Sequence, residues 1–166
     1  MCEFSFMKKY VLLLVLLFVT SSAWSQPIPI KKGVWSCGLL LQSGTRRPFS
    51  IGASVQYVPV DKIRADLNAS YYFALNYDLN LNLHYLIDLH HERFYVYPLV
   101  GFTAANMTYD SEENNHYPRQ HHVGLNLGGG IEYLLDYDLS LMFELRHAYM
   151  KVIGHTTAAA GVRLKF

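Results

Sequence analysis

The chain has 166 residues, with 14 basic and 13 acidic side chains and a formal net charge of +1. Hydrophobic residues make up 51% and charged residues 16%, whereas soluble domains typically carry about 25% charged residues. A nearly neutral chain lacks the basic surface that binding to nucleic acid requires. We therefore expect no nucleic-acid partner.

The N-terminal residues have the pattern of a secretory signal peptide. A basic start at residues 7–9 is followed by an apolar core at 11–19 and a small, polar stretch at 21–25. The core of about ten residues is shorter than the roughly 20 that a transmembrane helix needs, which disfavours the alternative of an N-terminal membrane anchor. We predict a signal peptide over residues 1–25 and a single domain over 26–166.

From residue 33 onward, apolar and polar residues alternate in segments separated by turn residues, which is the period of a β-strand. Most segments have ten or more residues, close to the ~9–11 that a tilted strand needs to cross a bilayer. Because no long apolar run follows residue 25, a membrane protein of this sequence would have to be a barrel. The pattern predicts an all-β fold, an eight-stranded antiparallel up-and-down transmembrane β-barrel. The expected strands are 33–42, 48–58, 62–73, 78–88, 93–107, 121–134, 138–149 and 156–166.

Two of the expected strands carry special residues. Pro98 lies inside the fifth segment, and a proline within a sheet needs an edge or a bulge. Residues 128–130 are three consecutive glycines, which favour a bend in the sixth strand over a phosphate-binding loop, because no helix follows them.

Alternation alone does not decide which face of a barrel is inside, since a soluble lipocalin-type carrier also has eight strands with apolar residues in its lumen. The polar face here consists mostly of Gly, Ser, Asn and Ala, which a narrow lumen accommodates, whereas a water-facing surface carries many Lys and Glu. Aromatic residues also gather at one end of the strands on the apolar face, as in an interfacial girdle. That predicted girdle consists of Trp35, Tyr57, Tyr85, Phe94, Tyr133 and Phe166.

Segments 80–85, 97–101, 124–133 and 162–166 together resemble the small outer-membrane β-barrel proteins of Gram-negative bacteria, a porin-family group of OmpA/OmpX-like barrels. The resemblance implies a location in the outer membrane and contact with its lipid. It also implies barrel assembly machinery and periplasmic chaperones as partners, and we expect a monomer. The alternating residues Val162, Leu164 and Phe166 are similar to the C-terminal signal by which such barrels are recognised for assembly.

The polar face collects charged residues, and buried charges must be paired or solvated. We therefore predict an ion-pair network in the lumen, with Lys165 on the same face. Either this network is a polar plug that satisfies itself, or its rearrangement opens a narrow path for ions. The predicted network consists of Arg64, Asp66, Glu132, Glu144, Arg146 and Arg163.

No catalytic, cofactor-binding or metal site is predicted. His147 is placed as in the barrels that modify lipid A, but Tyr149 stands where their serine nucleophile would be, and a histidine base needs such a nucleophile. Several histidines and two carboxylates near the outer rim do not form a rigid metal-binding pattern; these are His116, His121, His122, His155, Glu112 and Glu113. The predicted function is a non-enzymatic structural role in the envelope. A narrow gated pore is the alternative, ahead of an enzyme or a soluble carrier.

Overall fold

The computed structural model describes residues 30–45, 47–72, 76–90, 93–108, 119–136, 138–151 and 154–166. The predicted signal peptide lies outside these residues. All regular elements of the described chain are β-strands, and none of its segments forms a helix long and apolar enough to cross a membrane. The strands are β1 (Trp35–Gly44), β2 (Arg47–Val60), β3 (Ile63–Tyr72), β4 (Asn76–Tyr85), β5 (Ile87–His90), β6 (Phe94–Thr108), β7 (Arg119–Leu134), β8 (Leu139–Met150) and β9 (His155–Lys165).

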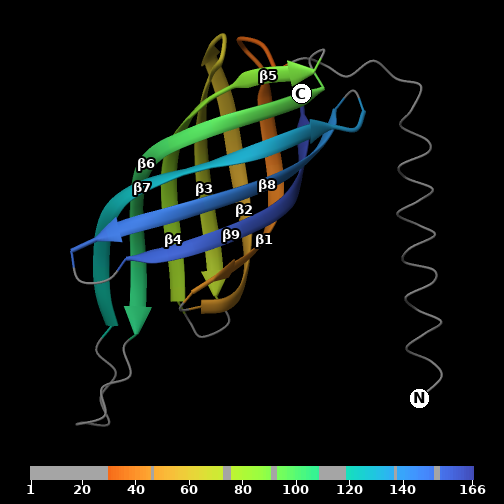
Figure 1. Cartoon of the computed structure of the whole chain (residues 1–166). Coiled ribbons are helices and arrows are strands. Elements are labelled where there is room, and N and C mark those ends of the chain that lie inside the picture. Colours follow the sequence, from red (N-terminus) through yellow and green to blue (C-terminus); the bar gives the residue numbers. More distant parts are fainter. Residues whose placement is uncertain are drawn as a thin grey trace, which may run out of the picture.

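The strands form one closed antiparallel barrel (Figure 1). Except for β4 and β5, neighbours in the chain pair with each other; β1 also pairs with β9, and β4 with β6. β4 and β5 are successive parts of one strand, separated only at Leu86, so the barrel has eight strands around its circumference. The predicted fold is confirmed, and the predicted strand bounds agree with the observed ones to within two residues at most ends.

The interruption at Leu86 lies beside Pro98. The pairs His84↔Leu99 and Ile87↔Val96 keep one register across the break, which leaves Pro98 facing the end of β4. Proline has no backbone N–H and cannot complete the ladder there. On the other side of this strand, the backbone N–H of Leu86 donates to the carbonyl of Lys62 at 2.7 Å, which continues the pairing with β3. The irregularity expected around Pro98 is therefore in the neighbouring strand.

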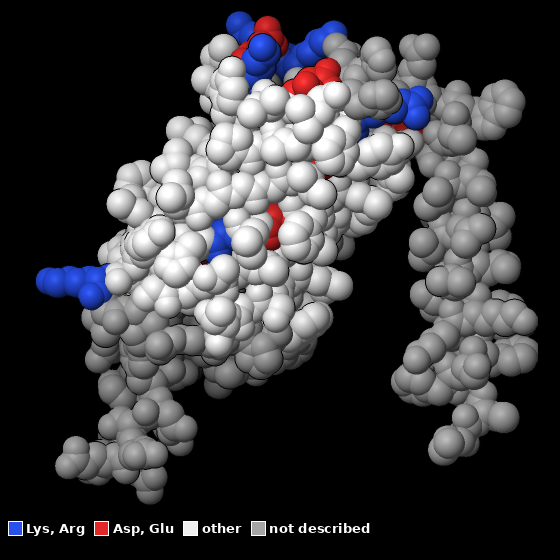
Figure 2. All heavy atoms as spheres, viewed as in Figure 1, with Lys and Arg blue, Asp and Glu red and all other residues white. Residues whose placement is uncertain are grey.

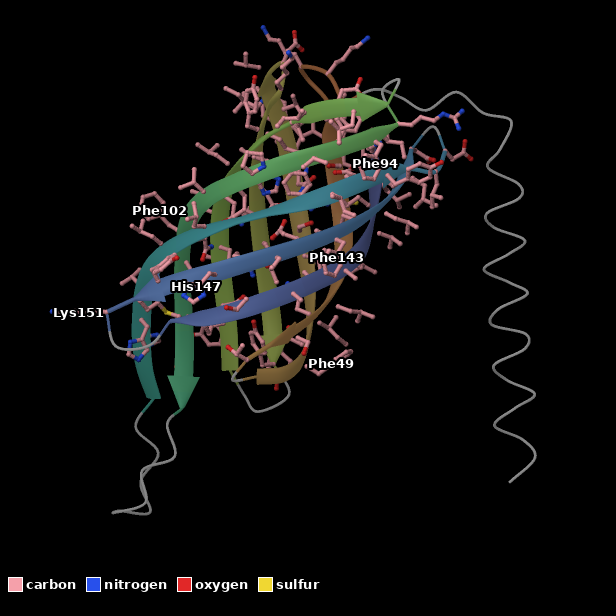
Figure 3. All side chains as sticks on the ribbon, in the orientation of Figure 1. Phe49, Phe94, Phe102, Phe143, His147 and Lys151 are labelled. Carbon is pink, nitrogen blue, oxygen red and sulfur yellow. The ribbon has the colours of Figure 1, made fainter. Side chains whose placement is uncertain are left out.

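The apolar face of the sheet points outward and the polar face points inward. Leu39 and Phe102 are 65% and 64% exposed, whereas Asn80 and Asn126 are almost completely buried. Figure 3 shows Phe102 projecting from the outer surface. In Figure 2 the visible face carries few Lys, Arg, Asp or Glu residues, and most of these gather at one end of the molecule. This inside-out distribution suits a protein surrounded by lipid.

The six residues of the predicted girdle lie at the ends of strands. Trp35 pairs with Tyr57, their rings being 4.5 Å apart, and Phe94 pairs with Tyr133. Four of the six point outward and are well exposed: Trp35, Tyr85, Tyr133 and Phe166. Tyr57 and Phe94 are half-buried.

Candidate functional site

Three buried side chains bind the carboxylate of Glu132 on β7. Its Oε2 accepts hydrogen bonds from Nη1 of Arg64, at 2.5 Å, and from Nη1 of Arg163, at 2.8 Å. Its Oε1 accepts one from the hydroxyl of Ser140, at 2.6 Å. All four side chains are fully buried. Both carboxylate oxygens are therefore satisfied by protein donors.

These ion pairs run across the barrel. Arg64 is on β3, which is separated from β7 by β4 and β6, and Arg163 is on β9, which is separated from β7 by β8. Inward-facing charges on strands that are not neighbours meet because the interior of an eight-stranded barrel is only wide enough for side chains. The pairs thus fill the lumen and link three strands that share no backbone ladder.

A second cluster is joined to the first through Tyr97. Nε of Arg64 donates to Nδ1 of His84 at 3.2 Å, and the guanidinium carbon of Arg64 lies 4.9 Å from the centre of the Tyr97 ring. The hydroxyl of Tyr97 donates to Oε2 of Glu144 at 3.2 Å. Oε1 of Glu144 lies 3.6 Å from Nη1 of Arg146. The aromatic ring therefore sits between two groups of charges.

The sequence analysis did not identify Tyr97 as a lumen residue, because the alternation around Pro98 is ambiguous. The signal that could have found it is Gly130, its register partner on β7. A Cβ at Gly130 would lie 2.5 Å from Cζ of Tyr97. Because Gly130 has no side chain, the ring of Tyr97 can occupy the space next to it.

Asp66 belongs to a layer of amide hydrogen bonds. It accepts from Nε2 of Gln56 at 2.6 Å and from Nδ2 of Asn82 at 3.4 Å. Nδ2 of Asn126 donates in turn to the side-chain oxygens of Asn80 and Asn82. Of the six residues predicted as an ion-pair network, the structure thus brings five into two ion-paired clusters and places Asp66 among amides.

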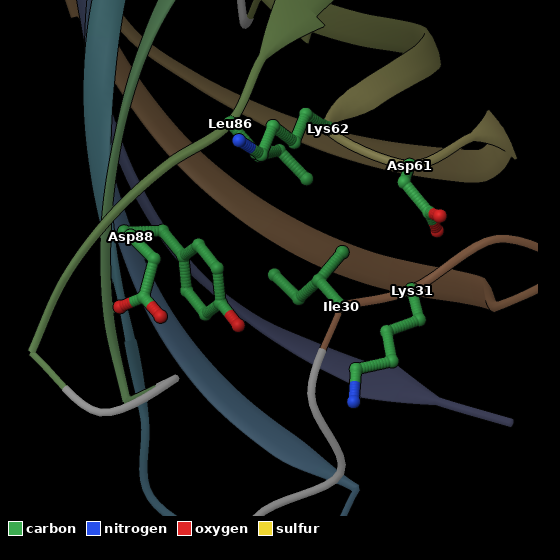
Figure 4. Close-up of a pocket in the computed structure, with 7 residues that line it drawn as sticks. Ile30, Lys31, Asp61, Lys62, Leu86 and Asp88 are labelled. Atoms are coloured by element: carbon green, nitrogen blue, oxygen red, sulfur yellow. The ribbon is translucent and has the colours of Figure 1, made fainter.

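An apolar cluster closes the lumen at the end where β1 begins. Its buried members include Val58 on β2, Leu134 on β7 and Leu86 between β4 and β5, and Ile30 joins them from the segment preceding β1. This segment is held by backbone hydrogen bonds from Gly33 to Val58 and from Val58 to Val34, at 2.8 and 3.1 Å. Beside it lies a pocket of about 220 Å³ (Figure 4), lined by Ile30, Lys31, Asp61, Lys62, Leu86, Asp88 and Tyr95.

His147 lies half-buried on the outer face near the other end of the barrel (Figure 3). Its Nδ1 is 2.8 Å from the hydroxyl of Thr156, a neighbour that the sequence analysis did not identify. Its ring also contacts Tyr149, at 4.4 Å between centroids. In the described part of the chain no carboxylate bonds to His147, so the pair lacks the acid that orients a catalytic histidine.

The side chains considered for metal binding lie partly outside the described residues. His116, Glu112 and Glu113 lie outside the described residues, and His155 is buried in the lumen at its β9 position. Among the described side chains, no three His, Cys, Asp or Glu residues converge as a metal site would require.

A closed antiparallel barrel with an apolar exterior and a charged, hydrogen-bonded interior has the architecture of a transmembrane β-barrel. Residues 31–166 match the family model described as the outer membrane protein beta-barrel domain. Because the match covers most of the sequence, the chain belongs to this family of outer-membrane barrels.

Solved structures share the fold at low sequence identity. The N-terminal β-barrel domain of Pseudomonas aeruginosa OprF has a TM-score of 0.72 and 18% identity, covering 81% of this chain and 98% of that one. Neisserial surface protein A has a TM-score of 0.54 and 17% identity, covering 80% and 95%. A de novo designed transmembrane β-barrel has a TM-score of 0.61 and 15% identity, covering 84% and 100%. No curated protein sequence gives a significant match.

Proposed function

We propose that the protein is a monomeric, non-enzymatic structural component of the bacterial outer membrane, exported by the signal peptide of residues 1–25. The observation that carries this proposal is the filled lumen. Glu132 is held from two walls by Arg64 and Arg163, and the apolar cluster around Leu134 lies at the adjoining mouth. A barrel with this interior offers lipid an apolar wall and offers solutes little room.

The same interior argues against a permanently open pore. A conducting pore needs a continuous polar path of sufficient width. Val58, Leu86 and Leu134, each at most 2% exposed, line one mouth with apolar groups. Opening a path would require both the apolar cluster and the Glu132 ion pairs to rearrange. Separating these ion pairs would leave buried charges without partners, and removing one partner of a buried ion pair costs about 3–5 kcal/mol.

Conductance tests the proposal directly. The protein is refolded into a planar lipid bilayer, with insertion checked by heat-modifiable mobility on gels, and current is recorded for the wild type and for Glu144→Gln. We expect negligible current from both, because the Glu132 cluster does not depend on Glu144. Discrete, reproducible channel openings in the wild type would favour the gated pore instead.

Location and enzymatic activity are tested separately. In cells, we expect the protein to stay with the outer-membrane fraction after carbonate extraction, whereas a soluble carrier would be released. We also expect the mass spectrum of lipid A to be the same with the wild type and with Thr156→Ala. A wild-type-specific mass shift that Thr156→Ala abolishes would identify Thr156 and His147 as a catalytic pair.

A role for Val162, Leu164 and Phe166 in recognition by the assembly machinery is part of the same proposal. These side chains point outward on β9 or directly after it, and all three are exposed. Phe166→Ser is expected to lower the amount of folded barrel in the membrane of cells. The purified variant should still refold in detergent, and failure to refold would indicate a structural role instead.

A further inference from the structure

The outward face of β9 carries small side chains in the first half of the strand. Alternate residues of a strand share one face, and Thr156, Ala158 and Ala160 are the outward-facing ones here. The register partners of Ala160 are large and well exposed, Phe143 on β8 and Leu41 on β1. The small residues therefore form the floor of a trough, the β9 trough, whose walls are side chains of β8 and β1.

An apolar pocket continues the β9 trough toward the middle of the barrel. Its volume is about 500 Å³, and its lining includes Leu39, Leu41, Ile51, Leu141, Ala160 and Val162. From Thr156 to Val162 the trough extends over about 20 Å of strand, at a rise of roughly 3.3 Å per residue. At a strand tilt of about 45°, this covers roughly 14 Å of depth, or about half of the ~30 Å hydrocarbon core. The trough thus has the length of one leaflet.

The end of the trough at Thr156 is polar. The hydroxyl of Thr156 lies 2.8 Å from Nδ1 of His147, whose ring contacts that of Tyr149. Lys151, two residues beyond Tyr149, is exposed, and Figure 3 shows it at the end of β8, beyond His147. Among the residues that the structure describes at this end, no Asp or Glu is exposed, since Asp78 is buried. This end therefore favours a negatively charged partner.

The opposite end of the barrel has no such preference, because its exposed side chains carry both signs of charge. These are Lys31, Lys32, Lys62, Asp61, Asp88 and Asp138. The longest connection between strands, residues 109–118, is at the same end as Lys151. Longer loops are extracellular in outer-membrane barrels, so the β9 trough faces the outer leaflet.

From these features we propose that the β9 trough binds a lipid of the outer leaflet whose headgroup carries a phosphate. One acyl chain lies over Ala158 and Ala160. The phosphate lies at the level of Tyr149 and Lys151, whose hydroxyl and ammonium groups are hydrogen-bond donors. The proposal rests on the proposed location in the outer membrane, which carbonate extraction tests separately.

A second copy of this chain is a poorer occupant. The trough is one strand wide, with roughly 10 Å between the two flanking strands, and offers an area on the order of 200 Å² over a length of about 20 Å. A stable protein–protein interface buries about 800 Å² on each partner. The dimensions of the trough therefore suit a single acyl chain.

Lipid binding is measured on the full barrel refolded in a non-ionic detergent. Dimyristoyl phosphatidate and dimyristoyl phosphatidylcholine are titrated separately, and native mass spectrometry counts the lipid molecules bound. We expect one phosphatidate molecule to bind with a dissociation constant at least fivefold lower than that of phosphatidylcholine. Inorganic phosphate should not displace it, because burial of the acyl chain contributes most of the affinity.

Three outcomes of this titration would overturn the proposal. Equal affinities for the two lipids would show that the headgroup charge is not recognised. Displacement by inorganic phosphate would indicate an anion site that does not involve the acyl chain. Retention of neither lipid would contradict the membrane location itself.

A matched pair of substitutions tests the trough. Ala160→Phe places a ring on its floor, so we expect both lipids to bind at least tenfold more weakly. Ala104→Phe makes the same change at an exposed alanine of β6, which is separated from β9 by β7 and β8, and should leave binding unchanged. Equal effects of the two variants would refute the assignment to β9.

A second pair tests the charge. Lys151→Met should weaken the binding of phosphatidate about fivefold, the usual effect of one basic residue near anionic lipid, and should leave that of phosphatidylcholine unchanged. Lys32→Met, at an exposed lysine before β1 on the opposite end, should alter neither. An unchanged preference for phosphatidate in Lys151→Met would exclude Lys151 from the site.

A measurement on the wild type covers the case in which Ala160→Phe does not fold. Phosphatidate with a photoreactive diazirine in one acyl chain is mixed with the barrel in phosphatidylcholine vesicles and irradiated. The cross-linked peptides should come mainly from β8, β9 and β1. Cross-links spread evenly over all strands would contradict the proposal, whatever the variants do.

Discussion

The imidazole of His84 is stacked on the phenol ring of Tyr97, with ring centroids 4.6 Å apart and planes inclined by 12°. Arg64 contacts the same two rings, through a hydrogen bond to His84 and over the face of Tyr97. Since Arg64 also pairs with Glu132, and Tyr97 bonds to Glu144, this stack connects the two charged clusters of the lumen. The two ion-paired clusters are therefore linked in one network.

Two substitutions at Tyr97 distinguish the contribution of its ring to stability from that of its hydroxyl. Tyr97→Phe keeps the stack and removes only the hydrogen bond to Glu144, so we expect a loss of about 1–3 kcal/mol in the free energy of unfolding. Tyr97→Ala also removes the ring and leaves a cavity, and we expect a loss of about 3–5 kcal/mol. Urea unfolding in lipid vesicles measures both. Equal losses for the two variants would show that the ring contributes nothing.

Removing the charge of Glu132 should be more damaging than removing that of Glu144. Glu132→Gln leaves Arg64 and Arg163 without their carboxylate, and breaking a buried pair in this way costs about 3–5 kcal/mol. Glu144 has a single, longer ion pair, at 3.6 Å from Arg146, beside its hydrogen bond from Tyr97, so Glu144→Gln should cost less. Urea unfolding of the two isosteric variants under identical conditions compares them. A larger loss for Glu144→Gln would contradict the central role assigned to Glu132.

The outer surface should tolerate charge according to depth. Leu81 is 54% exposed in the middle of β4, where lipid tails would surround it, so Leu81→Arg should cost about 2–4 kcal/mol. Leu89 is 59% exposed near the end of β5, and Leu89→Arg should cost only about 0–1 kcal/mol near the interface. Reversible unfolding from vesicles gives both values. Similar small losses at the two positions would indicate that water, and not lipid, surrounds the barrel.

The glycines of β7 should respond unequally to an added methyl group. A Cβ at Gly128 would clash with the carbonyl oxygen of Leu145 and lie 2.8 Å from Cα of Arg146, whereas at Gly129 its nearest atom would be the carbonyl oxygen of Tyr97 at 3.0 Å. Because overpacking typically costs about 1–3 kcal/mol, we expect Gly128→Ala to lie in that range and Gly129→Ala below it. Thermal unfolding in detergent ranks the two. The reverse order would show that β7 shifts freely at Gly128.

Much of this architecture could be predicted from the sequence because one physical signal repeats along the chain. Alternation in segments such as Leu79–Asn80–Leu81–Asn82 fixes both the strand and the face that each side chain occupies. The inward positions of Arg64, Glu132 and Arg163 followed from the same parity. The parity could not predict that Arg64 and Arg163 both bind the carboxylate of Glu132, because contacts across a lumen depend on the register and tilt of every intervening strand.

The closed mouth was not predicted, for a related reason. Val58 and Leu134 are apolar residues on the inward face, which is otherwise mostly polar in this barrel. They are buried because the chain before β1 places Ile30 across the same end. The alternation of apolar and polar residues predicts which face each side chain of a strand occupies. It does not predict where a segment outside the strands, such as the one with Ile30, packs.

The pairing of β1 with β9 has a consequence for the order of folding. At this seam Trp35 and Phe166 exchange backbone hydrogen bonds, from N–H of Trp35 to the carbonyl of Phe166 at 3.0 Å and in the reverse direction at 2.9 Å. The two residues that meet stand at opposite ends of the barrel sequence, so closure of the barrel makes the contact of greatest sequence separation, and we expect it to follow the formation of the hairpins. Until then, the free edges of β1 and β9 are open to pairing with other chains, which is the interval in which a chaperone would be needed.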